Sequence, residues 1–159
     1  MARNRDAAAV RVFPPAIPLV LILIGVGLNW LVPIDFGVEI PTPIHCWIGG
    51  TVAIAALVGL GGWSVFLLRR DGQSENPWKP TFRIVNQGPF RITRNPMYLQ
   101  MVIVCVAVAI AMMNWWILLL TPVCAWLLQR LAIMPEEAYL TQKFGDLYRS
   151  YKRRTRRWI

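Results

Sequence analysis

Two short segments of the chain hold the residues whose types and spacing suit chemistry. The first, residues 91–96, reads Arg-Ile-Thr-Arg-Asn-Pro and leads into a long apolar run. Asn95 is predicted to be a helix N-cap and Pro96 the first helical residue. Backbone N–H groups at such a helix start, with Arg94 beside them, can receive a carboxylate or a phosphate. The alternative is a well-capped membrane helix whose flanking arginines contact lipid phosphates.

The second segment begins Pro135-Glu136-Glu137, where the proline is expected to start a new helix with two acids in its first turn. Such acids are favourable at the positive end of a helix dipole, which is the simpler interpretation. Glu136 also lies at the predicted membrane edge, where an unpaired charge is costly, so a partner is expected. The candidates are Arg94 or Arg130 in an ion pair, or the ammonium or sulfonium group of a ligand.

Aromatic residues recur among basic residues along the remainder of this second segment. The pattern predicts an amphipathic surface helix, whose aromatic side chains would pack against the first segment or stack on a planar base. These aromatic residues are Tyr139, Phe144, Tyr148 and Tyr151.

Several other kinds of chemistry are disfavoured by what the sequence lacks. His45 is the only histidine and is predicted near the outer membrane interface, so no Ser-His or Cys-His pair is expected beside the two segments. Cys46, Cys105 and Cys124 lie in apolar runs without paired spacing, so they are expected to be small core residues and no metal site is predicted. The glycine-rich phosphate-binding patterns GxxxxGK and GxGxxG are absent from the sequence.

The helices that would position the two segments can be located from the stretches of sequence that contain no charged residue. Of 159 residues, 56% are apolar and 16% charged, which excludes a disordered chain, and three cysteines are too few for a disulfide-rich module. A helix needs roughly 20 apolar residues to cross the hydrocarbon core of a bilayer. Three runs contain no charged residue: 23 residues from Val12 to Ile34, 29 from Ile40 to Leu68 and 35 from Asn95 to Gln129.

The third run is too long for one span, and Met112-Met113-Asn114-Trp115-Trp116 near its middle predicts a tight hairpin. The alternative is a single tilted helix more than about 50 Å long. The predicted fold is an all-α integral membrane helical bundle with a cytoplasmic C-terminal amphipathic helix, in which residues 1–159 form one domain. We predict four transmembrane helices at 15–32, 46–68, 97–113 and 115–134, with segments 69–96 and 135–159 outside the membrane.

The distribution of basic residues predicts the orientation of these spans. All 17 Lys and Arg residues precede the first span, lie between the second and third, or lie at or beyond the end of the fourth, whereas the loop 35–43 has two acids and no base. The positive-inside rule then places both termini in the cytoplasm of a multi-pass inner or plasma membrane protein. No small-x-small cleavage pattern follows the first span, which is expected to be retained. The basic tail 152–157 is expected to contact anionic lipid, and no nucleic acid is predicted as a partner.

Taken together, the two segments resemble the motifs of the isoprenylcysteine carboxyl methyltransferase and phospholipid methyltransferase superfamily. Residues 80–99, PTFRIVNQGPFRITRNPMYL, resemble its first motif, in which Thr-x-x-Val leads through Gly-Pro-Phe/Tyr-Arg to Arg-His/Asn-Pro-x-Tyr. Residues 136–151, EEAYLTQKFGDLYRSY, resemble its second motif. The resemblance covers residues 76–158, roughly half of the chain.

The resemblance implies an integral membrane enzyme that binds S-adenosylmethionine at the cytoplasmic face, between these motifs. Methyl transfer is an in-line displacement at a sulfonium, which needs orientation and desolvation rather than a nucleophilic side chain. The acidic pair would face the ammonium group of the cofactor, and Arg94 with the backbone of 95–98 would face its carboxylate. Tyr98 and Leu99 would line the adenosine pocket or the substrate path. The implied cofactor contacts are Gly88, Arg94, Asn95, Pro96, Tyr98, Leu99, Glu136 and Glu137, with catalytic roles for Arg94 and Glu136.

The methyl acceptor is expected to be an amphiphilic or small molecule that enters from the bilayer: a prenyl-cysteine carboxylate, a phospholipid amine or a small thiol. Gln100 stands where the superfamily commonly has glycine, so the cofactor contact at this point is either lost or reshaped. A second hypothesis is an NADPH-dependent membrane reductase, because sterol and steroid reductases carry a similar Arg-His-Pro-x-Tyr motif, although Glu136 and Glu137 oppose an anionic cofactor. A third hypothesis is a non-catalytic membrane scaffold.

Overall fold

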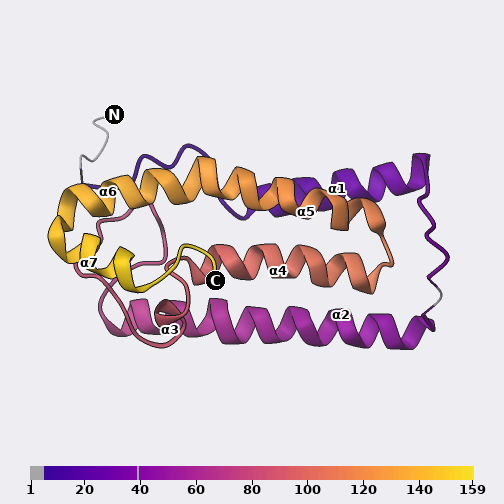
Figure 1. Cartoon of the computed structure of the whole chain (residues 1–159), viewed down its shortest axis with the longest axis horizontal. Coiled ribbons are helices and arrows are strands. Elements are labelled where there is room, and N and C mark those ends of the chain that lie inside the picture. Colours follow the sequence, from indigo (N-terminus) through magenta and orange to yellow (C-terminus); the bar gives the residue numbers. More distant parts are fainter. Residues whose placement is uncertain (1–5, 39) are drawn as a thin grey trace.

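The computed structural model describes residues 6–38 and 40–159, which form an elongated helical bundle with no β-strand among them (Figure 1). Helix α2 packs against α4, α4 against α5, and α5 against α1. The apolar sequence runs explain this arrangement, because each helix buries one side against its neighbours. The bundle helices are α1 (Ala16–Leu31), α2 (Thr42–Ala56), α4 (Pro96–Ala111) and α5 (Trp115–Leu128).

Two of the helices continue far beyond these limits through short π-helical stretches. Helix α2 runs through Leu57–Gly62 into α3 (Trp63–Arg70), and α5 runs through Gln129–Ile133 into α6 (Met134–Phe144). The two continuous helices contain 29 and 30 residues and are long and apolar enough to cross a membrane. Helices α1 and α4 are apolar but shorter, with 16 residues each.

The hairpin predicted in the third apolar run is confirmed. Helix α4 ends at Ala111 and α5 starts at Trp115. Asn114 fixes the turn, because its side chain accepts a hydrogen bond from the backbone N–H of Ile117 at 3.1 Å and caps α5. Its Nδ2 also donates to the backbone oxygen of Gly25 at 3.3 Å, which ties the turn to α1.

Two expectations for the C-terminal segment are wrong. Pro135 does not start a separate helix, because the π-helical stretch before it carries the helix through without a break. The single amphipathic helix is in fact two helices, α6 and α7 (Asp146–Arg154). They meet at Gly145, whose φ of +52° is a conformation that favours glycine and lets the chain reverse. The C-terminus consequently returns to the start of α4 (Figure 1).

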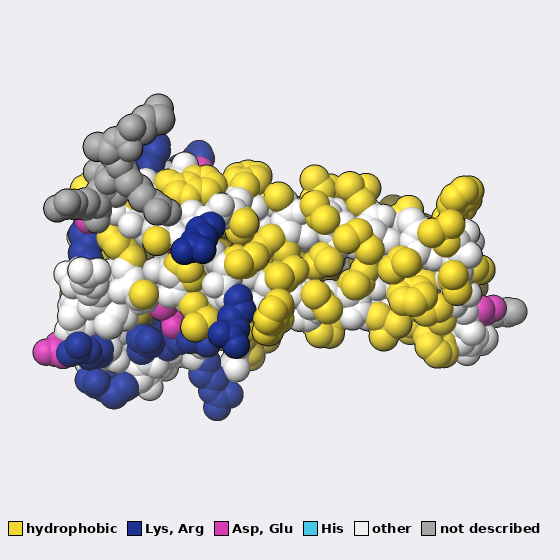
Figure 2. All heavy atoms as spheres, turned by 90° about the horizontal axis from the view of Figure 1, so that it is seen from above, with side chains coloured by type: hydrophobic (Ala, Val, Ile, Leu, Met, Phe, Trp, Pro, Cys, Tyr) yellow, Lys and Arg dark blue, Asp and Glu magenta, His cyan; other side chains and the backbone are white. Residues whose placement is uncertain are grey.

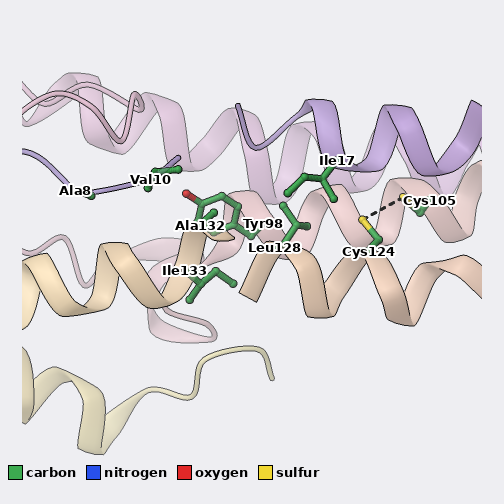
Figure 3. Packing of buried hydrophobic residues seen from close by; sticks show 9 residues of the cluster. All are labelled: Ala8, Val10, Ile17, Tyr98, Cys105, Cys124, Leu128, Ala132 and Ile133. Carbon is green, nitrogen blue, oxygen red and sulfur yellow. Dashed lines mark hydrogen bonds between the residues drawn. The ribbon is translucent and has the colours of Figure 1, made fainter. Parts of the chain in front are cut away.

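Apolar side chains cover the surface along the bundle, and Lys and Arg gather at the end formed by α6 and α7 (Figure 2). The interior at that end includes Ala8 and Val10, which precede α1 and pack with Ile133 (Figure 3). Cys105 and Cys124 are buried as predicted, with their sulfur atoms 3.9 Å apart. Cys46 was expected in the core but is exposed on α2, where its sulfur lies 3.6 Å from the backbone oxygen of Ala111 at the end of α4.

Candidate functional site

The first predicted segment leads into α4 as expected, but its capping differs. Asn95 occupies the N-cap position and Pro96 is the first residue of α4. The Asn95 side chain makes no cap hydrogen bond with the helix, and its Nδ2 donates to the backbone oxygen of Arg157 at 2.9 Å. Within the described residues, no group accepts a hydrogen bond from the backbone N–H of Met97 or Tyr98. These N–H groups remain available at the positive end of the helix.

The C-terminal tail lies along this helix start. The backbone N–H of Arg94 donates to the backbone oxygen of Arg156 at 2.9 Å, and the Thr93 hydroxyl donates to that of Arg157 at 2.9 Å. Tyr151 in α7 donates from its hydroxyl to the backbone oxygen of Phe90 at 2.7 Å. These contacts bring the two motif-bearing segments together, as the sequence predicted.

Glu137 is 5% exposed and holds several basic side chains in place. Its Oε1 accepts hydrogen bonds from Arg94 Nη2 at 2.9 Å and from Arg157 Nε at 3.1 Å, and its Oε2 accepts one from Arg157 Nη2 at 2.8 Å. Lys152 Nζ lies 3.6 Å from Oε2. Arg94 also donates from Nη1 to the backbone oxygens of Lys152 and Thr155, both at 3.0 Å. Glu137 is therefore the centre of an ion cluster that joins α4, α6 and the tail.

Glu136 is the neighbour of Glu137 in α6, yet its surroundings differ. Its Oε2 accepts a hydrogen bond from the Tyr98 hydroxyl at 2.8 Å. Among the described residues, no Lys or Arg nitrogen lies within ion-pair distance of its carboxylate. Of the two arginines expected as partners, Arg94 pairs with Glu137 and Arg130 is exposed to solvent. The ion pair considered for Glu136 is therefore not formed, and its partner is a neutral hydroxyl.

The pKa values of the two neighbouring glutamates are shifted in opposite directions. Burial raises the pKa of Glu136 above its ordinary value, and the charge of Glu137 adds to this effect, while the Tyr98 hydrogen bond opposes it. Burial also acts on Glu137, but the hydrogen bonds and charges of Arg157 and Arg94 outweigh it and lower the pKa of this carboxyl. In this site the charge of Glu137 is thus balanced by arginine side chains, whereas no positive charge in the described part of the chain lies beside the Glu136 carboxylate.

Both glutamates line a cavity of about 430 Å³ at the end of the bundle formed by α6 and α7. The cavity is enclosed by the segment before α1, the loop after α3, the start of α4, and helices α6 and α7. Its walls combine the Glu136 carboxylate and the Arg94 guanidinium with apolar side chains such as Met101. A cavity with a few convergent polar groups in an apolar wall is the usual form of a small-molecule site.

Comparison with known families agrees with this arrangement. The family model described as phospholipid methyltransferase matches residues 43–147, which include α4, the hairpin and the acidic pair. The chain belongs to the phospholipid methyltransferase family. This family lies within the isoprenylcysteine carboxyl methyltransferase-type superfamily of membrane methyltransferases, so the resemblance inferred from the two motifs is confirmed and a membrane methyltransferase is implied.

One relative of this phospholipid methyltransferase family member comes from Haemophilus influenzae (strain ATCC 51907 / DSM 11121 / KW20 / Rd) and is described as an uncharacterized protein. It is 37% identical over 71 residues, which are 40% of this chain and 100% of the relative. No solved structure matches the chain.

The cavity of this family member brings together most of the residues that the sequence predicted. Gly88 and Leu99 do not line it. Gly88 instead has a φ of +54°, and a Cβ there would lie 2.9 Å from Leu67 Cδ1, so its role is to let the loop approach α3 closely. Leu99 is buried within the bundle. The predicted residues that line the cavity are Arg94, Asn95, Pro96, Tyr98, Glu136 and Glu137.

Gln100, which replaces the common family glycine, lies outside the lining of the cavity. Its side chain packs against Gly61 in the π-helical stretch after α2, where a Cβ at Gly61 would overlap the Gln100 Oε1 atom. Because Gly61 has no side chain, it leaves room for the larger residue at position 100.

The sequence did not indicate two further walls of the cavity. Phe13, Pro14 and Pro15 form part of one wall, and Trp78 of the loop after α3 stacks on Phe13 with ring centroids 6.3 Å apart. Trp78 Nε1 also donates to the backbone oxygen of Val10 at 2.8 Å, which ties this loop to the chain before α1. The aromatic and proline residues at these positions were the available signals, but local sequence does not show which distant segment such residues contact.

Other reactive side chains lie away from this cavity. His45 Nδ1 is 2.9 Å from the backbone oxygen of Ala111, so this residue lies at the opposite end of the bundle. Across residues 6–38 and 40–159, no group of three or more His, Cys, Asp or Glu side chains is placed to hold a metal ion.

Proposed function

We propose that this chain is an S-adenosylmethionine-dependent methyltransferase whose cofactor binds in the cavity with its amino-acid end at Glu136. The Glu136 carboxylate carries this proposal. It lines the cavity, its charge is disfavoured by burial, and its hydrogen-bond partner among the described residues is the neutral Tyr98 hydroxyl. The ammonium group of the cofactor would supply the missing positive charge through a charge-assisted hydrogen bond.

Arg94 and the start of α4 fit the other polar group of the same amino-acid end. The Nε atom of Arg94 is buried without a hydrogen-bond partner, although both Nη atoms are occupied. Together with the free backbone N–H groups of Met97 and Tyr98, it can bind a carboxylate. Because Glu137 holds Arg94 in place, the guanidinium needs little reorganisation when the carboxylate binds.

The residues of this site would act by binding and orientation. S-adenosylmethionine supplies a methyl group on a sulfonium, and transfer forms the bond from the acceptor to this carbon as the sulfur–methyl bond breaks, leaving S-adenosylhomocysteine. Glu136 and Arg94 would fix the amino-acid end of the cofactor, and Tyr98 would hold the Glu136 carboxylate in position. The segment before α1 and the loop after α3 would keep water away from the reacting atoms.

We further propose that all four bundle helices cross the membrane. A helix of 16 residues is about 24 Å long, somewhat less than the roughly 30 Å of the hydrocarbon core. Apolar residues continue beyond both ends of α1, and Met112 and Met113 follow α4, so each apolar stretch is longer than its helix. This agrees with the apolar surface along the bundle (Figure 2).

The proposed orientation is supported by the basic residues that gather at one end of the bundle. Lys143 Nζ in α6 lies 2.6 Å from Asp6 Oδ1, so the described start of the chain lies beside the C-terminal helices. Arg153, Arg154 and Arg156 are exposed there. The positive-inside rule places this end in the cytoplasm, where the three arginines would contact anionic lipid head groups.

The acceptor would be an amphiphile or a small molecule that reaches the cavity from the bilayer, past the apolar side chains of Leu68, Met97 and Met101. The test is transfer of a labelled methyl group from S-adenosylmethionine by the purified protein in lipid vesicles. Phosphatidylethanolamine, N-acetyl-S-farnesylcysteine and a long-chain thiol would be supplied in separate reactions. We expect label in the product of at least one reaction, and no label in any of the three would contradict the acceptor class.

Binding of S-adenosylhomocysteine is expected to weaken as the pH falls. The ammonium group requires the charged form of Glu136, and burial raises the pKa of this carboxyl above the ordinary value of 4.5. Protonation therefore begins at higher pH than for an exposed glutamate, and binding releases the proton again. Calorimetric titrations from about pH 5 to about pH 8 would measure the affinity, and buffers of different ionisation enthalpy would measure proton release. The Glu136→Gln variant should lack this dependence, and an equal pH dependence in both proteins would assign it to another group.

A further inference from the structure

Gln73, which follows α3, is a buried amide that the proposed contacts do not use. The residue lines the cavity and is 4% exposed. Its Oε1 accepts hydrogen bonds from the backbone N–H groups of Phe82 at 3.1 Å and Arg83 at 3.4 Å. Two N–H donors at one end of the amide identify that end as the oxygen, so the orientation of the group is fixed.

The other end of this amide has no partner. Among the described residues, the buried side-chain nitrogen and oxygen atoms without a hydrogen bond are Gln73 Nε2 and Arg94 Nε, and both residues line the same cavity. A buried donor without an acceptor lowers stability, so each such group in a native protein requires an explanation. Arg94 is explained by the carboxylate of the proposed cofactor, whereas Gln73 calls for an acceptor on another part of a ligand.

We infer that Gln73 binds the adenine base of the cofactor, with Nε2 donating a hydrogen bond to a ring nitrogen. This inference rests on the proposed function. An uncharged donor suits an uncharged acceptor, and adenine offers ring nitrogens, while the charged groups of the cofactor are taken by Glu136 and Arg94. The stacked pair Phe13–Trp78 lines the same cavity as Gln73 and supplies aromatic surface suited to a planar base.

The loop after α3 would then hold the adenosine end, and the start of α4 with α6 the amino-acid end. This division assigns a function to Gln73 and Trp78, which lie before residues 80–99, the first motif. The apolar side chains of Leu68 and Met101 would be left for the methyl acceptor.

The test replaces Gln73 by glutamate, which has the same size and retains an oxygen for the N–H groups of Phe82 and Arg83 but loses the donor. Gln87→Glu is the matched control, because this exposed residue is in the same loop and does not line the cavity. Binding of S-adenosylhomocysteine and of 5′-methylthioadenosine would be measured by calorimetry on detergent-purified protein. The second ligand keeps the adenosine end and lacks the amino-acid end.

Gln73→Glu is expected to weaken both ligands by about tenfold, whereas Gln87→Glu changes neither. Glu136→Gln is expected to weaken S-adenosylhomocysteine alone, because 5′-methylthioadenosine has no ammonium group. An affinity of Gln73→Glu within about twofold of wild type would overturn the inference, since the amide donor would then contribute nothing to ligand binding. A loss confined to S-adenosylhomocysteine would also overturn it, because Gln73 would then contact the amino-acid end.

A second measurement does not depend on how well the variant folds. The 1-deaza, 3-deaza and 7-deaza analogues of S-adenosylhomocysteine each replace one ring nitrogen by carbon, and at least one should bind wild-type protein about tenfold more weakly. If all three analogues bound as tightly as S-adenosylhomocysteine itself, the inference would be overturned and the proposed function would remain intact. A wild-type protein that binds no S-adenosylhomocysteine would instead contradict the proposed function, and the inference with it.

Discussion

Replacing Glu136 by glutamine is expected to weaken the binding of S-adenosylhomocysteine by at least about a hundredfold, equivalent to roughly 3 kcal/mol. Glutamine keeps the size of the side chain and an oxygen that can accept the Tyr98 hydroxyl at the present 2.8 Å. It removes the negative charge that would bind the ammonium group in the cavity. The affinity can be measured by calorimetry on detergent-purified protein.

The matched control is Asp146→Asn, which makes the same chemical change on the exposed surface of α7. The Asp146 side chain is 94% exposed, and the residue does not line the cavity. This variant should bind the ligand as wild type does. An affinity of Glu136→Gln within about threefold of wild type would mean that the carboxylate does not contact the cofactor.

The second large effect is expected in stability. Replacing Glu137 by alanine should lower the free energy of unfolding by about 3–5 kcal/mol, because buried charges are left without their partner. Arg94 would lose its carboxylate contact at 2.9 Å, and Arg157 its two at 3.1 and 2.8 Å. The C-terminal tail should then detach from the start of α4.

Denaturant unfolding in detergent would measure the stability, and hydrogen exchange over residues 155–158 would report the detachment of the tail. The comparison is Glu136→Gln. Because burial raises the pKa of Glu136, protonation of this group adds stability that is lost as the pH rises through its pKa. The neutral glutamine should therefore leave the stability unchanged or higher at pH 7. Equal losses in the two variants would contradict the separate roles assigned to the neighbouring glutamates.

Much of the bundle could be predicted from the sequence because its signals are local. The predicted first span, 15–32, lies within one residue of α1, and Asn114 with the following tryptophans marked the start of α5. A charge-free run, an N-cap and a proline each act within a few residues of the chain. The meeting of the two motif-bearing segments was also predicted, since both lay on the same expected side of the membrane.

The rest depended on contacts between distant parts of the chain. The sequence placed Glu136 and Glu137 together but did not indicate that Glu137 takes Arg94 and Arg157, because that choice is set by how the tail returns. The tail returns because Gly145 adopts a positive φ, and a glycine within an otherwise helical pattern does not by itself reveal a reversal. For the same reason, the sequence did not place Gln73 in the cavity.

The cavity beside Glu136 is proposed to bind the methyl donor. The most direct measurement is a calorimetric titration of the detergent-purified protein with S-adenosylhomocysteine, with NADPH titrated in parallel. We expect saturable binding of S-adenosylhomocysteine and none of NADPH. Binding of NADPH alone would contradict the account in favour of a membrane reductase, and binding of neither ligand would contradict it in favour of a non-catalytic membrane protein.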